Sequence, residues 1–166
     1  MTDPEGRPRL LLQSAGRGVL AGLVGVAAMT VSEKAEQRVT GRQNSYVPGR
    51  TLKTMVTGTA SQQDQPLLWN HAMHWGTGAA LGVLRGVWAV IGLRGPQAHL
   101  AYTVVRLATD QTLENGAGTG APPRTWPRRE QVVDVTHKAL YALVTGLVAE
   151  RLVPPDLERR RGSVSR

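Results

Sequence analysis

Eight ionisable side chains that could take part in chemistry stand in pairs beside the apolar stretches of this 166-residue chain. The pairs are Glu33 with Glu36, His71 with His74, Asp110 with Glu114, and Asp134 with His137. If the chain runs alternately up and down through these stretches, the ends that carry the four pairs lie at one common level. We therefore expect these groups to meet in a single polar layer.

Two kinds of chemistry fit such a layer. Carboxylates and imidazoles spaced i, i+3 on the helices of a bundle can converge on a divalent metal ion. The candidate ligands are Glu33, Glu36, His71, His74, Asp110, Asp134 and His137. The pattern departs from the Glu-x-x-His pairs of di-iron bundles, because only the last pair mixes the two residue types. The alternative is proton or ion handling, since histidines titrate near neutral pH, and transport by so small a chain would need a homo-oligomer.

A structural role for the same residues is the third interpretation. They could be helix-end residues in contact with water or lipid headgroups, or a hydrogen-bonded network that fixes the register of the helices. No catalytic signature accompanies them: the chain has no Gly-x-Ser-x-Gly elbow and no phosphate-binding loop. It also lacks cysteine, which excludes thiolate zinc sites and cysteine nucleophiles. The sequence thus assigns no catalytic residue and favours a protein that is not an enzyme.

The elements that position these residues are four helices in one domain. Apolar periodicity and the placement of proline and glycine predict helices over residues 10–38, 67–93, 97–114 and 128–153, between a flexible tail (1–9) and a basic tail (154–166). The segment 41–66 reads as a loop with at most a short helix near Leu52. Because Gly95-Pro96 makes a tight break, the second and third helices should be antiparallel neighbours. The expected fold is an all-α, four-helix, antiparallel up-and-down bundle.

Glycine spacing favours a transmembrane bundle. Gly18 and Gly22 are four residues apart, and Gly78, Gly82 and Gly86 repeat that interval on another helix, which lets helix backbones approach closely. In water each such glycine costs about 1 kcal/mol relative to alanine, so a soluble bundle gains little from them. The stretch 75–93 is the strongest candidate span, because about 20 mostly apolar residues cross a bilayer. A soluble helical interaction bundle is the remaining alternative.

The formal net charge of +8 is carried largely by tails and loops. Its densest run, Arg159 to Arg161, suits anionic lipid headgroups and favours a cytoplasmic position for both tails. No stacking aromatics or recognition-helix pattern accompany the charge, which argues against a nucleic-acid partner. The predicted partners are the lipid bilayer and a second copy of the chain.

Three segments resemble a known family. They are Gly22 to Thr30 followed by Glu33, Asn70 to Gly76 continuing through Gly82 to Gly86, and the trio Asp134, His137 and Tyr141. They are similar to the first, second and last helices of small bacterial inner-membrane proteins of the YagU type. The resemblance covers the four helices and not the tails. It implies a multi-pass protein of the inner (cytoplasmic) membrane, and it carries over no activity or catalytic residue.

Overall fold

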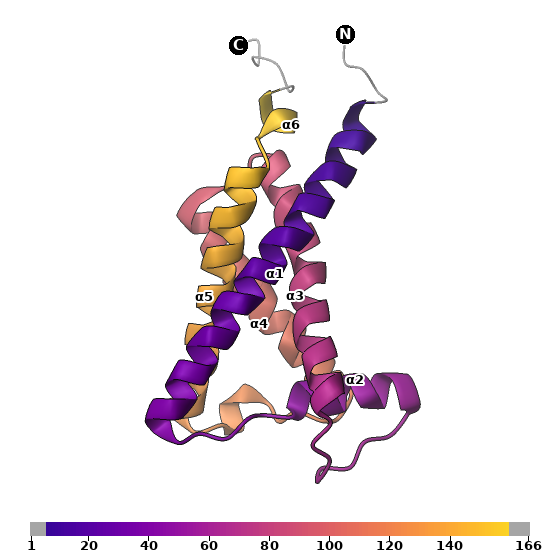
Figure 1. Cartoon of the computed structure of the whole chain (residues 1–166), viewed down its shortest axis with the longest axis vertical. Coiled ribbons are helices and arrows are strands. Elements are labelled where there is room, and N and C mark those ends of the chain that lie inside the picture. The colour runs from indigo at the N-terminus through magenta and orange to yellow at the C-terminus, as the bar shows by residue number, and fades with distance from the viewer. Residues whose placement is uncertain (1–5, 160–166) are drawn as a thin grey trace.

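The computed structural model describes residues 6–159, and every regular element in that range is helical, which confirms the all-α class. The elements are α1 (Gly6–Thr40), α2 (Val47–Thr57), α3 (Leu67–Val90), α4 (Gly95–Gly116), the 3-10 turn η1 (Pro123–Thr125), α5 (Arg128–Leu152) and α6 (Asp156–Arg159). The first turn of α1 and the short α6 lie at the same end of the molecule (Figure 1). Arg160 and Arg161 of the predicted basic tail lie outside the described residues.

The four predicted helices correspond to α1, α3, α4 and α5, and α2 is the addition. It spans eleven residues of a segment that was expected to hold at most a short helix. Pro48 stands in its first turn, where the missing N–H costs nothing. Gly58 ends it in the left-handed conformation, with φ of 81°. The proline and glycine that suggested a loop therefore mark the two ends of a helix.

The helix α1 packs antiparallel against both α3 and α5 (Figure 1). Its glycines face those of α3: Gly18 and Gly22 meet Gly78, Gly82 and Gly86. A Cβ atom added to Gly18, Gly22 or Gly82 would collide with the backbone of the opposite helix. The predicted glycine-lined contact between two helices is confirmed.

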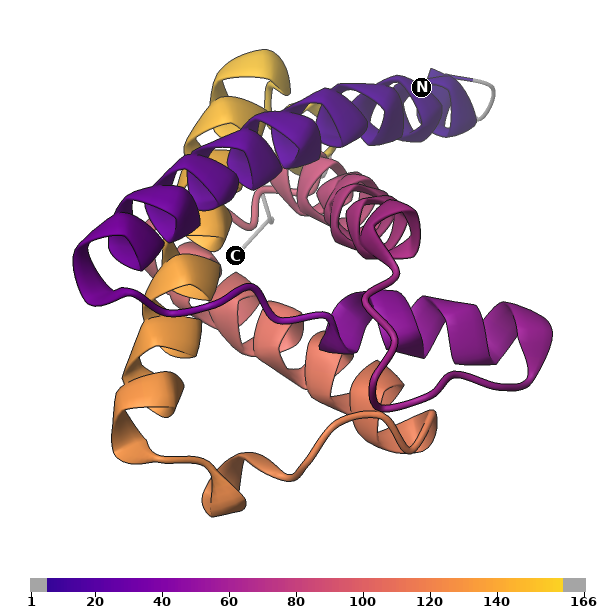
Figure 2. The ribbon, with the colours of Figure 1, turned by 60° about the horizontal axis from the view of Figure 1, so that its bottom comes forward.

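The helices α3 and α4 do not pair along their length as expected. They are joined by a tight turn in which Gly92 and Gly95 have positive φ values of 93° and 78°. Near that turn the rings of Trp88 and Tyr102 meet edge to face, 5.9 Å apart. Beyond it the two helices diverge, and α2 packs against both of them (Figure 2). The helices therefore form an open bundle in which α3 and α4 are not neighbours along their length, in place of a closed four-helix bundle.

Large apolar side chains lie mainly on the outside, while several charged ones lie inside. Buried polar residues include Arg85, Arg106 and Lys138, each no more than 8% exposed. Exposed large hydrophobic residues include Leu12, Leu20, Leu68, Leu100, Val104, Leu143 and Leu147. Each of these three buried cations has an acidic partner, as a buried charge requires.

Two of the described helices, α1 and α5, are long and apolar enough to cross a membrane. The stretch 75–93, predicted to be the strongest span, is not one of them, and that prediction is wrong. The helix α3 ends at Val90, so the apolar Ile91 and Leu93 of that stretch lie outside it.

Tyr141 ties three helices together at the centre of the apolar core formed with Val26, Met29 and Tyr102. Its hydroxyl donates to the carbonyl oxygen of Gly78 at 2.7 Å and lies 3.0 Å from the hydroxyl of Tyr102. The substitution Tyr141→Phe leaves the buried Tyr102 hydroxyl without this partner and removes the second hydrogen bond of the Gly78 carbonyl, which lies inside α3. We expect a loss of about 1–3 kcal/mol in the free energy of unfolding.

The measurement is denaturant unfolding of the purified protein in detergent. Tyr46→Phe is the matched control, because the structure gives the Tyr46 hydroxyl no hydrogen bond to any described residue. An equal effect of the two substitutions would contradict the anchoring role of Tyr141.

Candidate functional site

The polar residues singled out in the sequence line one cavity of about 590 Å³ between α1, α3, α4 and α5, at the end of the molecule where α2 lies. Of the eight predicted residues, seven line it: Glu33, His71, His74, Asp110, Glu114, Asp134 and His137. The eighth, Glu36, does not. The helices therefore bring the predicted pairs to a common level.

A network of ion pairs occupies one wall of this cavity. Lys138 Nζ lies 2.7 Å from Asp134 Oδ1 and 3.2 Å from Asp110 Oδ2, so one ammonium group joins α5 to α4. Arg106 Nε lies 3.2 Å from the same Asp110 oxygen, at the i, i+4 spacing of a helix. The two aspartates are thus neutralised by basic side chains.

Of the three histidines that line the cavity, two connect helices through hydrogen bonds and the third lies at the rim of the cavity. His137 Nδ1 hydrogen-bonds with Ser32 Oγ at 3.1 Å, which joins α5 to α1. His74 Nε2 does the same with Thr30 Oγ1 at 3.1 Å, which joins α3 to α1. His71 is exposed at the edge of the cavity.

Glu36 belongs to a separate local contact. Its carboxylate accepts hydrogen bonds from Thr40 at 2.7 Å and from Arg42 Nε at 2.9 Å. These bonds hold the chain as it leaves α1. Glu36 therefore stabilises a helix end, as one of the three sequence interpretations foresaw.

Within residues 6–159, no three histidine, aspartate or glutamate side chains are grouped so that they could hold a metal ion. The contacts explain why, since Lys138 holds two of the proposed ligands and Arg42 holds a third. The layer is built as an ion-pair network with a cavity beside it.

Four groups in the cavity wall keep unused bonding capacity. Arg106 and His137 are 3% and 6% exposed, yet Arg106 Nη1 and His137 Nε2 form no hydrogen bond with any described residue. The half-buried carboxylates Glu33 and Glu114 form no ion pair within residues 6–159. Buried polar groups in proteins are nearly always hydrogen-bonded, so these groups are suited to bind water or a polar solute.

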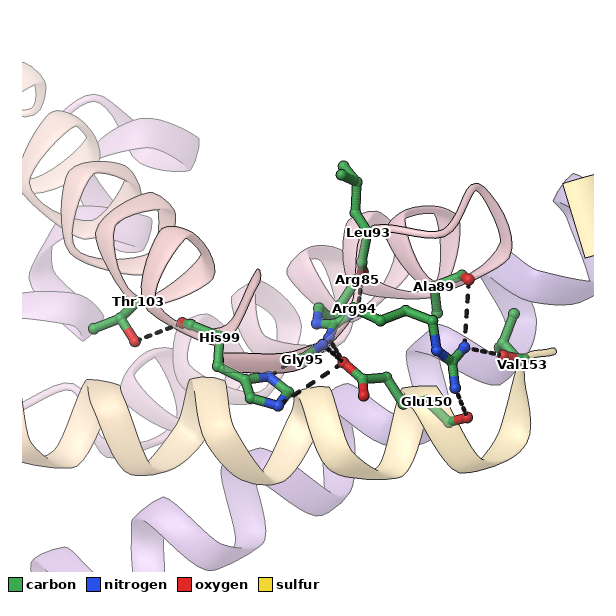
Figure 3. A network of polar contacts seen from close by, with 9 residues as sticks. All are labelled: Arg85, Ala89, Leu93, Arg94, Gly95, His99, Thr103, Glu150 and Val153. Atoms are coloured by element: carbon green, nitrogen blue, oxygen red, sulfur yellow. Dashed lines mark hydrogen bonds and ion pairs between the residues drawn. The ribbon is translucent and has the colours of Figure 1, made fainter. Parts of the chain in front are cut away.

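A second polar cluster lies at the opposite end of the molecule, and Figure 3 shows it. The fully buried Arg85 of α3 pairs with Glu150 of α5. Glu150 also accepts the backbone N–H of Gly95 at 2.8 Å, where a carboxylate complements the dipole at the start of α4. His99 Nε2 lies 3.8 Å from the same Glu150 oxygen.

Arg94 completes this cluster by capping two helix ends. It donates to the carbonyl oxygens of Glu150 and Val153 at the end of α5, the latter at 2.7 Å, and to that of Ala89 in the last turn of α3 at 3.4 Å. The final carbonyls of a helix have no partner within it, so a guanidinium group satisfies them. The cluster clamps the ends of three helices (Figure 3).

Sequence reasoning did not identify Glu150, and His99 was not among the predicted site residues. Arg106 and Asp110, which line the cavity, lie about two and three turns beyond His99 along α4, so His99 reaches the clamp instead of the cavity. A signal for Glu150 was present: an arginine inside an apolar helix requires an acidic partner, and Glu150 is the acidic residue near the end of the last long helix.

No protein family matches this chain, and comparison with curated proteins and with solved structures also finds no match. The YagU-type resemblance therefore remains a prediction.

Proposed function

We propose that this chain is a multi-pass membrane protein whose polar cavity, open at one end of the helices, binds a small charged solute. The observation that carries the proposal is the distribution of side chains. Charged groups such as Arg106 and Lys138 are buried, and large apolar residues such as Leu100 and Val104 are exposed.

A lipid environment accounts for this distribution. A charge facing the middle of a bilayer costs about 2.5–3.5 kcal/mol on insertion scales, so intramembrane charges face the protein interior and pair there. Apolar side chains on the outside cost nothing in lipid, whereas in water a surface of this kind marks an interaction site or aggregates. The helices α1 and α5 supply two spans, and glycine contacts pack α3 against α1. The YagU-type resemblance adds the inner membrane as the expected location.

The cavity supports solute binding over a purely structural layer. Its volume of about 590 Å³ lies within the range of about 300–1,000 Å³ typical of small-molecule sites. Arg106 and His137 line it, and each has a buried side-chain nitrogen without a hydrogen-bond partner among the described residues. A network that served only to fix helix register would satisfy its own groups.

Proton or ion handling is the second candidate, and one observation favours it. Glu33 and Glu114 line the cavity without an ion pair to any described residue, on two different helices. Unpaired carboxylates that line the same cavity as His74 are suited to accept and release protons.

Membrane integration predicts the result of an extraction experiment. Sodium carbonate at high pH removes peripheral proteins, and the full-length chain should remain in the membrane pellet and dissolve only in detergent. The control is Leu100→Ala, which shortens one outward side chain and should leave partition unchanged. Recovery of the chain in the aqueous wash would overturn the proposal.

A second experiment tests solvent access to the cavity by cysteine labelling. Because the chain has no native cysteine, only an introduced cysteine can react. Thr77 lines the cavity, and Thr77→Cys should react with a membrane-impermeant maleimide from one side of sealed proteoliposomes. Leu147→Cys, which lies on the apolar outer face, is the control and should not react. Failure of Thr77→Cys to react from either side contradicts an open cavity.

A further inference from the structure

We propose that the cavity binds a small zwitterion of about the size of an α-amino acid, with one ammonium group and one carboxylate or phosphate group. This inference rests on the proposed solute-binding function and names the chemical class of the solute. Its basis is the arrangement of charges in the cavity wall.

The charges that line the cavity balance. Five basic and five acidic side chains face it, in addition to three histidines. A solute with a net charge would meet as many like charges as opposite ones, and like charges in juxtaposition are costly. A zwitterion can place each of its ends against the opposite sign, so a balanced wall selects it over a simple anion or cation.

Arg106 provides the site for the anionic end. It is 3% exposed, its Nη1 has no partner among the described residues, and its Nε lies 3.2 Å from Asp110 without the alignment of a hydrogen bond. Its guanidinium group is fixed 4.9 Å above the ring of Tyr141. A carboxylate or phosphate oxygen placed against this guanidinium group would satisfy the free donor with a charge-assisted bond, and His137, whose Nε2 also has no partner among the described residues, lines the same cavity.

Glu33 and Glu114 provide the site for the ammonium end. Asp110, Asp134 and Glu36 all have basic partners, whereas these two carboxylates form no ion pair within residues 6–159. They approach the cavity from α1 and α4. An ammonium group at either carboxylate would be bound by a group that the fold leaves free of ion pairs.

The remaining lining favours an apolar body for the solute. Met29, Met73 and Trp126 line the same cavity and offer thioether and indole surface. L-leucine, which joins the two charges to a branched apolar side chain, is therefore the first probe. O-phosphoethanolamine joins an ammonium group to a phosphate group, as the headgroup of an ethanolamine lipid does, and tests that source.

The experiment is titration calorimetry on the full-length chain in a non-ionic detergent. L-leucine is compared with N-acetyl-L-leucine, which keeps only the negative charge, and with L-leucinamide, which keeps only the positive one. We expect saturable binding of L-leucine or O-phosphoethanolamine, and at least tenfold weaker binding of both singly charged analogues. Tighter binding of L-leucine indicates a free amino acid, and tighter binding of O-phosphoethanolamine indicates a lipid headgroup.

Variants connect the binding to the named groups. Arg106→Gln, Glu33→Gln and Glu114→Gln should each weaken zwitterion binding tenfold or more, and Arg38→Gln, which is exposed and outside the cavity, should not. Glu33 and Glu114 form no ion pair within residues 6–159, so their substitution should not destabilise the fold. If Arg106→Gln fails to fold, zwitterion binding by the two glutamate variants tests the proposal.

Two outcomes overturn the inference: neither zwitterion binds the native chain, or the singly charged analogues bind as tightly as L-leucine. If the Thr77→Cys protein is labelled in the cavity while no zwitterion binds, the solute class is wrong and the proposed function stands. If the Thr77→Cys protein is not labelled, the proposed function itself fails.

Discussion

Replacing Gly82 with leucine is expected to separate α1 from α3 and to lower the free energy of unfolding by about 3 kcal/mol or more, at the upper end of overpacking costs. Even a single Cβ at this position would lie 2.9 Å from the Cα atom of Gly22 and would collide with the carbonyl oxygen of Gly18. Backbone atoms cannot relieve the clash by a rotamer change, as a side chain can. The whole helix contact must open to admit the leucine.

Gly76→Leu is the matched control on the same helix. Gly76 is exposed, and an added Cβ there has nothing within 4 Å beyond its own helix. This variant should be neutral or slightly more stable, because glycine is a poor helix former. Denaturant unfolding in detergent measures both variants, and equal stabilities would contradict the glycine contact as the basis of the fold.

The second large effect is expected for Glu150→Ala at the clamp. Arg85 is fully buried, and Glu150 is its acidic partner, so the substitution leaves a buried guanidinium without a counter-charge. Breaking a buried pair from one side costs about 3–5 kcal/mol. The loss of the acceptor for the Gly95 N–H adds to the cost. Thermal unfolding in detergent should show a much lower midpoint.

A double variant separates the buried charge from the other contacts. Arg85→Met combined with Glu150→Ala removes both charges and should recover a large part of the lost stability, because an apolar replacement of a buried pair is often neutral. Asp64→Ala is the control, since Asp64 pairs with Lys53 on the surface and should have little effect. A double variant no more stable than Glu150→Ala alone would show that Arg85 is not the source of the effect.

The features predicted correctly from the sequence are those that depend on spacing within one helix. Gly18 and Gly22 share a face because they are four residues apart, and His71 and His74 share one because they are three residues apart. Once the helices alternate in direction, such faces meet without further information. The glycine contact and the cavity lining follow from this rule.

What could not be predicted depends on partners that are distant in sequence. Glu150 is 65 residues from Arg85, and no local pattern joins them. The divergence of α3 from α4 follows from the packing of α2 against both. The full length of α2 was not predicted, because a proline such as Pro48 indicates a helix break unless it is known to lie in the first turn of a helix. The ion pairs of Lys138 were not predicted either, because the predicted layer comprised acidic residues and histidines and did not include the lysine next to His137.

The central claim is that the apolar outer face contacts lipid while the charged cavity contacts water. Nitroxide spin labels test it directly in this cysteine-free chain, because oxygen concentrates in lipid and a polar nickel chelate in water. In liposomes, labels at Leu20→Cys, Leu100→Cys and Leu147→Cys should collide mainly with oxygen, and a label at Thr77→Cys mainly with nickel. Equal and high nickel access at all four positions would contradict the claim.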